Sequence, residues 1–231
     1  MTIRRYIPNF LTLCNLLSGC VGIVVVSQGH LTTAAYLIWL AALLDFADGL
    51  VARALKAYSN IGADLDSLAD VVSFGVLPSF IMFALLEKVV PVELLAYVGF
   101  TIALFSALRL AIFNVDTRQK DHFIGLPVPA SALLISAFPL STPDFFQALV
   151  NSPAVLIGVT LVDSYLLVAS VPLLAFKFKN YTWQDNQVKY LFAIGALVLF
   201  ILLQTVAIPI IIIAYIVLSI IVNQTTKPAD L

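Results

Sequence analysis

The sequence predicts an all-α polytopic membrane protein, a bundle of about eight transmembrane helices in a single domain over residues 1–231. Of the 231 residues, 61% are hydrophobic and only 11% are charged, and the mean hydropathy is +1.05. Soluble domains contain about 45–50% apolar and about 25% charged residues. The composition therefore excludes an ordinary soluble domain, and the net charge of −1 gives no indication of a nucleic-acid partner.

A helix needs about 20 predominantly apolar residues to cross a bilayer core of about 30 Å. Apolar runs separated by short polar or Pro/Gly-containing breaks predict spans at residues 8–27, 31–55, 62–86, 91–113, 127–149, 153–176, 188–204 and 206–222. The first run is interpreted as a membrane helix rather than a cleaved signal, because no small-residue cleavage site follows it.

The fifth and sixth spans are the least regular, and six spans with re-entrant pieces is the alternative there. Pro139 and Pro143 interrupt the fifth span, and Asp163 lies in the outer half of the sixth. A buried Asp163 requires a partner, which we expect to be Tyr165 or a neighbouring backbone group, in a structural role. The last two spans contain almost no polar side chains and are interpreted as packing helices.

The lysines and arginines are distributed asymmetrically over these spans. If the N-terminus lies inside, eleven of the twelve fall on the cytoplasmic side, and only Lys88 falls outside. Positive residues concentrate in cytoplasmic loops. We therefore expect a protein of the cytoplasmic (inner) membrane whose turn at residues 56–60 faces the cytosol.

Five aspartates lie within residues 45–70 of this weakly charged chain. On helices, Asp45 and Asp48 share one face, as do Asp66 and Asp70, so two antiparallel helices could bring four carboxylates to one point. One acid could form a structural ion pair with Arg53, but five acids are too many for that explanation. Like charges in an apolar setting require a cation, and oxygen ligands favour Mg²⁺ or Mn²⁺.

Small residues and an arginine lie beside these acids. Gly49 follows Asp48, and Ala52 lies seven residues after Asp45, on the same helical stripe. Missing side chains let a large group approach the backbone, and the planar fork of Arg53 suits a phosphate. The combination indicates a nucleotide diphosphate bound through divalent ions, with phosphoryl transfer at the cytosolic face of the membrane.

The complete pattern resembles the signature of the CDP-alcohol phosphatidyltransferase family at every fixed position. The matching residues are Asp45-x2-Asp48-Gly49-x2-Ala52-Arg53-x8-Gly62-x3-Asp66-x3-Asp70. The resemblance implies a helical membrane enzyme that binds a CDP-activated lipid through divalent metal, with two ions of Mg²⁺ or Mn²⁺ expected. It also implies release of CMP and, commonly, a homodimer.

The resemblance assigns roles to individual positions. It implies metal binding by Asp45, Asp48, Asp66 and Asp70, and it makes Asp70 the general base toward the acceptor hydroxyl. It implies nucleotide binding by Asp48, Gly49, Ala52, Arg53, Gly62 and Asp66. Asp64 lies outside the signature and is expected to contact the nucleotide, support the metal site or be merely solvated. Thr12 and Asn15 share a face of the first span and could contact the nucleotide or bond to a neighbouring helix.

Four further stretches resemble the phosphatidylserine synthases of this family. They are Pro8-Asn9-Phe10-Leu11-Thr12-x2-Asn15, Asp66-Ser67-x-Ala69-Asp70-x2-Ser73-Phe74-Gly75, Ala107-Leu108-Arg109-Leu110-Ala111-x-Phe113-Asn114 and Phe123-Ile124-Gly125-Leu126-Pro127-Val128-Pro129. The resemblance implies CDP-diacylglycerol and L-serine as substrates. Ile112 departs from that pattern, because the subfamily often has a basic residue there.

The residues themselves favour an amino-acid acceptor only weakly. Arg109 could hold the serine carboxylate or simply anchor its helix at the cytoplasmic side, and Asn114, Ser67 and Ser73 are polar candidates at the same level. Glycerol phosphate and inositol phosphate are alternative acceptors, which should need a denser basic cluster. A divalent-cation transporter is the alternative of another class, but its polar groups should lie on both sides of the midplane.

Overall fold

Long apolar helices make up most of the computed structural model, which describes residues 6–57, 60–116, 122–141, 144–174 and 182–225. Within these residues, the stretches long and apolar enough to cross a membrane are Tyr6–Ser27, Leu31–Leu55, Ile61–Glu87, Glu93–Val115 and Trp183–Asn223. Two shorter apolar helices cover Val128–Leu140 and Pro153–Val168. The predicted all-α polytopic fold is confirmed.

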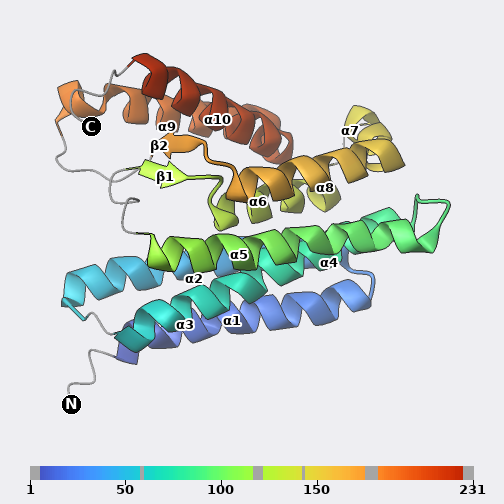
Figure 1. Ribbon diagram of the computed structural model, residues 1–231, viewed down its shortest axis with the longest axis horizontal. Helices are drawn as coiled ribbons and strands as arrows, with labels where there is room; N and C mark the ends of the chain where they lie inside the picture. Colours follow the sequence, from blue (N-terminus) through green and yellow to red (C-terminus); the bar gives the residue numbers. More distant parts are fainter. Residues whose placement is uncertain (1–5, 58–59, 117–121, 142–143, 175–181, 226–231) are drawn as a thin grey trace.

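The first two helices form a tight hairpin. Helix α1 (Tyr6–Ser27) ends in a turn at Gly29, whose φ of +83° is in the region that favours glycine. The Gly29 amide donates to the Val26 carbonyl at 2.8 Å, which satisfies one of the last carbonyls of the helix. Helix α2 (Leu31–Leu55) then runs back along α1 (Figure 1).

The next long helix is continuous but contains a π-helical turn. It consists of α3 (Asn60–Asp70), the π-helical η2 (Val71–Val76) and α4 (Leu77–Glu87). The wider turn comes directly before Pro78, whose ring would clash with the Phe74 carbonyl in a regular α-helix. The chain returns through the 3₁₀-helical η3 (Glu93–Phe100) and α5 (Thr101–Val115).

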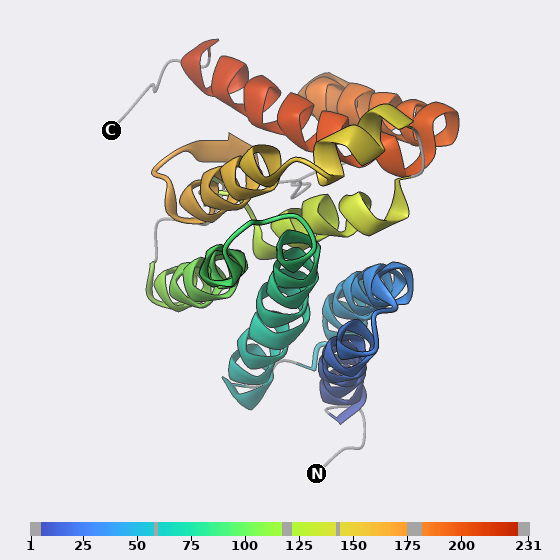
Figure 2. The same ribbon diagram turned by 90° about the vertical axis from the view of Figure 1, so that its right-hand side faces the viewer.

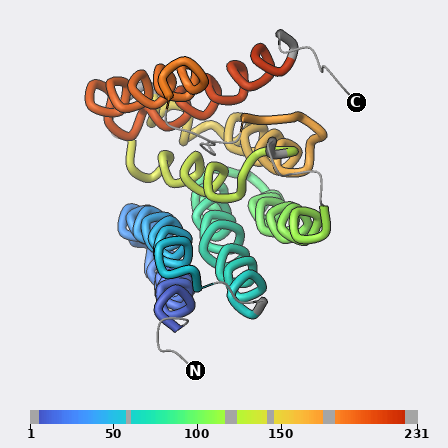
Figure 3. Tube along the Cα trace, turned by 90° about the vertical axis from the view of Figure 1, so that its left-hand side faces the viewer, coloured from blue at the N-terminus to red at the C-terminus, as the bar shows by residue number. Residues whose placement is uncertain are grey.

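The C-terminal half packs across this first group of helices. Strand β1 (His122–Ile124) pairs antiparallel with β2 (Pro172–Leu174), with Phe123 opposite Leu173. Along the chain, the segment that connects the two strands forms α6 (Val128–Leu140), α7 (Asp144–Val150) and α8 (Pro153–Val168). The chain ends in α9 (Trp183–Leu203), η4 (Gln204–Val206) and α10 (Ala207–Thr225). Figures 2 and 3 show α6 and α8 between the α1–α5 group and the α9–α10 pair.

The structure corrects the extent of two predicted spans. The fifth, 127–149, is divided, because α6 ends at Leu140 and α7 begins at Asp144. The sixth, 153–176, is too long, because α8 ends at Val168, the backbone is extended from Ala169, and the chain becomes a strand at Pro172. The residue before a proline disfavours helical geometry, so Val171 does not resume the helix. At about 1.5 Å per residue, α6 and α8 extend only about 20 and 24 Å, less than a bilayer core.

Close packing of α1 on η2 generates a stability prediction. A Cβ added at Gly19 would lie 2.9 Å from the Ser73 Cα, whereas a Cβ at Gly195 in α9 would meet no atom within 4 Å. Gly19→Ala should therefore destabilise the protein by about 1–3 kcal/mol through overpacking. Gly195→Ala should be neutral or stabilising by about 0.5–1 kcal/mol, because alanine is the better helix former.

The melting temperatures of the two variants and the wild type, measured by thermal unfolding in the same detergent, test this stability prediction. Equal melting temperatures for Gly19→Ala and the wild type would contradict the close approach of α1 and η2.

Candidate active site

Three aspartates from two neighbouring helices form a carboxylate cluster. Asp45 and Asp48 lie in the C-terminal part of α2, and Asp66 lies in α3. One oxygen from each lies within 4.8 Å of the others. None of the three forms a salt bridge with any residue that the structure describes. The predicted convergence of the α2 and α3 acids is thus seen for three of the four.

The fourth acid, Asp70, lies one turn further along α3 and is held from α1. The Asn15 side-chain amide donates to Asp70 Oδ1 at 3.3 Å. In parallel, the Thr12 hydroxyl lies 2.6 Å from Asp48 Oδ2, and 3.1 Å from the Pro8 carbonyl oxygen. The polar face of α1 therefore supplies one hydrogen-bond donor to each of two acids.

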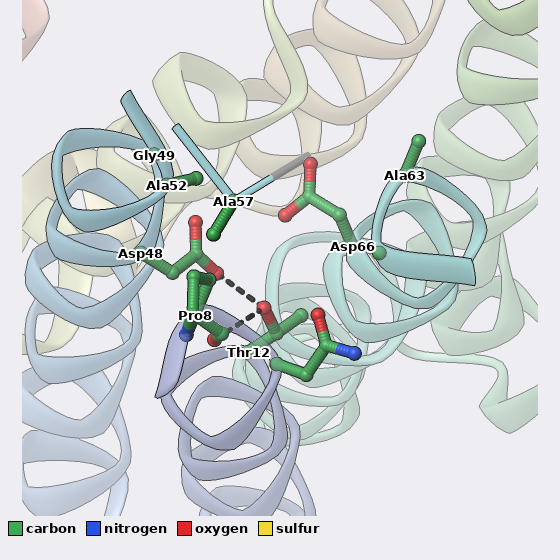
Figure 4. A pocket seen from close by; sticks show the side chains of 10 residues that line it. Pro8, Thr12, Asp48, Gly49, Ala52, Ala57, Ala63 and Asp66 are labelled. Atoms are coloured by element: carbon green, nitrogen blue, oxygen red, sulfur yellow. Dashed lines mark hydrogen bonds between the residues drawn. The ribbon is translucent and has the colours of Figure 1, made fainter. Parts of the chain in front are cut away.

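Small residues line a pocket of about 150 Å³ on one side of the cluster (Figure 4). We call it the glycine-lined pocket; its residues are Pro8, Asn9, Thr12, Asp48, Gly49, Ala52, Ala57, Gly62, Ala63 and Asp66. In Figure 4, Asp48 from α2 and Asp66 from α3 point toward the space between the two helices. This side of the cluster can receive a flat group close to the backbone.

The space beside Gly49 is not filled by the protein itself. A Cβ at Gly49 would meet nothing closer than the Arg53 guanidinium at 3.8 Å, an ordinary van der Waals distance. The α2 backbone conformation does not require glycine at this helical position either. Glycine at this position therefore serves the pocket rather than the packing of the fold.

A second pocket of about 460 Å³ opens on the other side of the cluster. We call it the arginine-lined pocket; its residues are Asp45, Arg53, Ala63, Asp66, Ser67, Asp70, Arg109, Leu110, Phe113, Asn114, Pro127, Val128 and Pro129. The two pockets share Ala63 and Asp66. The acids thus lie at the boundary between a narrow pocket and a wider one.

Arg109 enters the wider pocket from α5 and is held in place by an aromatic ring. Its guanidinium carbon lies 4.7 Å from the centroid of the Phe113 ring, and the residue is buried. It also lies within electrostatic range of Asp70 and of the hydroxyl of Tyr215 in α10. The sequence indicated no role for α10 near the site; the polar side chains in the span predicted over 206–222 are Tyr215 and Ser219.

The structure brings two of the predicted acceptor residues together and leaves one outside. Ser67 and Asn114 hydrogen-bond to each other across the arginine-lined pocket, with Asn114 Nδ2 2.9 Å from Ser67 Oγ. Ser73 lies in neither pocket, because the π-helical turn directs its hydroxyl to the Asn15 carbonyl at 2.9 Å. Ser73 is thus separated from the other predicted acceptor residues.

Two predicted nucleotide-binding residues also lie outside the pockets. Asp64 is exposed on α3 and lines neither of them, as expected for the alternative in which it is solvated. Asn15 lines neither pocket and instead bonds to Asp70, as the helix-bonding alternative proposed. Arg53 borders both, since it lines the wider pocket and lies beside Gly49 in the narrower one.

The carboxylate cluster fits a divalent cation. Three carboxylate oxygens converge from separate residues, and Asp66 Oδ1 is buried with no hydrogen-bond partner among the described residues. A buried carboxylate oxygen without a partner costs free energy unless a cation or a hydrogen-bond donor binds it. Oxygen-only ligation is typical of hard cations such as Mg²⁺ and Mn²⁺.

Comparison with known proteins agrees with this site. Residues 5–176 match the family model described as CDP-alcohol phosphatidyltransferase. That region contains all four acids and both pockets, and the chain belongs to the CDP-alcohol phosphatidyltransferase family.

Individual relatives are similar over most of the chain. The CDP-diacylglycerol–serine O-phosphatidyltransferase of Helicobacter pylori (strain J99) is 31% identical over 183 residues, 74% of this chain and 72% of that protein. The archaetidylserine synthase of Methanothermobacter thermautotrophicus is 35% identical over 167 residues, 71% of this chain and 68% of that protein. The corresponding serine O-phosphatidyltransferase of Bacillus subtilis is 33% identical over 132 residues, 57% of this chain and 73% of that protein.

Metal binding can be tested without the reaction. Asp48→Asn should weaken Mn²⁺ binding by more than about 100-fold, because even changes outside the ligand set of a metal site cost about 10–100-fold. Asp64→Asn removes an acid of the same helix that lines neither pocket, and it should bind Mn²⁺ like the wild type. Electron paramagnetic resonance of free Mn²⁺ in titrations of purified protein measures both affinities. Equal weakening in the two variants would contradict the assignment.

Proposed function

We propose that this protein transfers the phosphatidyl group of CDP-diacylglycerol to L-serine and releases CMP. The observation that supports this most directly is the pair of pockets that share Asp66. A nucleotide bound in the glycine-lined pocket and an acceptor bound in the arginine-lined pocket would meet at the acids. The named activities of the serine-specific relatives support serine as the acceptor.

In this proposal, the two sides of the site bind different substrates. The backbone of α2 at Gly49 and Ala52 accommodates the cytidine, and Arg53 binds a phosphate at the border between the pockets. Arg109, held over Phe113, binds the serine carboxylate. Holding both substrates this way turns a bimolecular reaction into an effectively intramolecular one.

Asp70 is the general base in this proposal. It lines the acceptor side of the acids, and Asn15 fixes one of its oxygens. The serine hydroxyl oxygen attacks the phosphorus that bears the diacylglycerol, its proton passes to Asp70, and the bond to the CMP oxygen breaks in line. Divalent cations, held by Asp45, Asp48 and Asp66 with Asp70 adjacent, would draw negative charge from the pyrophosphate when bound.

Substitutions of the acids should separate binding from turnover. Asp48→Ala should abolish CMP release and nucleotide binding together, because the metal also positions the pyrophosphate. Asp70→Asn should reduce kcat by about 10²–10⁴-fold while retaining part of the nucleotide affinity, because it removes the base. Nucleotide binding by calorimetry and CMP release measure the two effects. Normal serine turnover by Asp70→Asn would rule out its role as the base.

Activity assays with a series of acceptors identify the acceptor substrate. Purified protein supplied with CDP-diacylglycerol should release CMP with L-serine and not with glycerol phosphate or inositol phosphate. Of the described residues, the basic ones that line the acceptor pocket are Arg53 and Arg109, too few for a phosphorylated acceptor beside a pyrophosphate. A CDP-activated ether lipid belongs in the same series, because one relative is named an archaetidylserine synthase.

The distribution of charge supports an active site that faces the cytosol from the inner membrane. Arg53 and Lys56 lie at the end of α2 that contains Asp45 and Asp48, Arg109 lies near the C-terminal end of α5, and Lys189 lies near the start of α9. Lys88 instead follows α4, at the far end of the helix that begins with the acidic segment α3. This agrees with the positive-inside rule. The homodimer is proposed from the family resemblance alone, and the mass of the purified protein in nanodiscs tests it.

A further inference from the structure

A buried carboxyl lies in α8, away from the cluster of acids. Asp163 is 1% exposed, and the Ser131 hydroxyl of α6 donates to its Oδ2 at 2.5 Å. The partner is therefore neither Tyr165, which is 66% exposed, nor a backbone group. A charged residue in a membrane helix costs about 3 kcal/mol to insert, so such residues generally have a function.

Asp163 lies toward the end of α8 that approaches the site, and not in the outer half as predicted. It is ten residues from the start of the helix and five from its end at Val168. The next residue, Ser164, has its hydroxyl 2.9 Å from the Thr101 hydroxyl of α5. Consecutive residues of α8 thus hold α6 and α5.

The end of α8 also holds the segment that precedes α6. The Leu126 amide donates to the Leu166 carbonyl at 2.8 Å. Gly125 has a φ of +79°, and a Cβ there would lie 2.4 Å from the Leu167 carbonyl oxygen, so the close approach requires glycine. Residues 125–131 are therefore attached to α8 at both ends, by backbone contacts at one and by Asp163 at the other.

These attachments matter because the same segment forms one side of the arginine-lined pocket. Pro127, Val128 and Pro129 line that pocket together with the acids, and we call these three residues the proline wall. Arg109 and Asn114 of α5 form the adjoining side. Helix α8 contributes no residue to either pocket, yet it holds both of these sides (Figure 1).

We propose that Asp163 and Ser131 are positioning residues, whose hydrogen bond sets the distance of the proline wall from the acids and thereby the affinity for the acceptor. The nucleotide side is lined by residues of α1, α2 and α3 and by Ala57, and it includes neither the proline wall nor any residue of α5. Loss of the hydrogen bond between Asp163 and Ser131 should therefore lower the affinity for the acceptor and not for the nucleotide. That this substrate is serine rests on the proposed function.

Kinetics with each substrate varied in turn test the proposal. Asp163→Leu and Ser131→Ala should each raise the KM for serine by roughly three- to tenfold, the factor expected from loss of one hydrogen bond. The KM for CDP-diacylglycerol and the kcat should stay within about twofold of the wild type. Asp163→Asn should behave like the wild type, because its amide oxygen still accepts from Ser131. The double variant should be no worse than either single variant, because both remove the same bond.

Thr160→Val is the matched control. Thr160 is buried in the same helix, but its hydroxyl bonds to the Leu156 carbonyl one turn earlier. This variant should leave both KM values unchanged. Melting temperatures of all variants show whether any of them is simply unfolded.

Several results would overturn the inference. They are an unchanged serine KM in both Asp163→Leu and Ser131→Ala, an Asp163→Asn variant as impaired as Asp163→Leu, and equal increases in both KM values. Failure of the proposed function is distinguishable, because it would appear in the wild type as CMP release with a different acceptor. The KM for that acceptor would then give the same test of the positioning.

Discussion

Mutual repulsion among acids inside a membrane protein is the constraint on which the arrangement of the first three helices depends. Three carboxylates that converge within 4.8 Å in a medium of low dielectric constant repel one another strongly. Helix α1 reduces this cost with hydroxyl and amide donors, and it can do so only because glycine lets it pack closely on η2. A divalent cation held by the three carboxylates would offset the remaining repulsion.

The same helices divide the space around the acids by side-chain size. On the α1 side, Gly49, Ala52 and Ala63 leave room for a flat group against the backbone. On the α5 side, two arginines and a pair of prolines enclose a wider pocket. Asp66 lines both pockets, so it is the acid through which the two spaces adjoin.

Local periodicity made the helices and the acid cluster predictable. Residues three or four positions apart share a helical face whatever the tertiary packing, so Asp45 with Asp48 could be placed by spacing alone. Ser73 could not, because the π-helical turn between it and Asp66 changes the rotation per residue. Spacing could not identify Ser131 as the partner of Asp163 either, because Ser131 lies 32 positions away and the contact depends on how α6 packs against α8. Nor does a hydropathy window register the end of α8 at Val168, where the backbone becomes extended at Ala169 within an apolar run.

The π-helical turn in the third membrane-crossing helix has a consequence for how members of such a family can diverge. The segment before it, Asn60–Asp70, presents acids to the ligands, and the segment after it, Leu77–Glu87, presents apolar residues to the core. Because the extra backbone width resets the angular phase between them, each segment keeps its own orientation. Substitutions that repack the apolar segment need not rotate the acidic one, so the two faces of this continuous helix are free to differ independently in such a family.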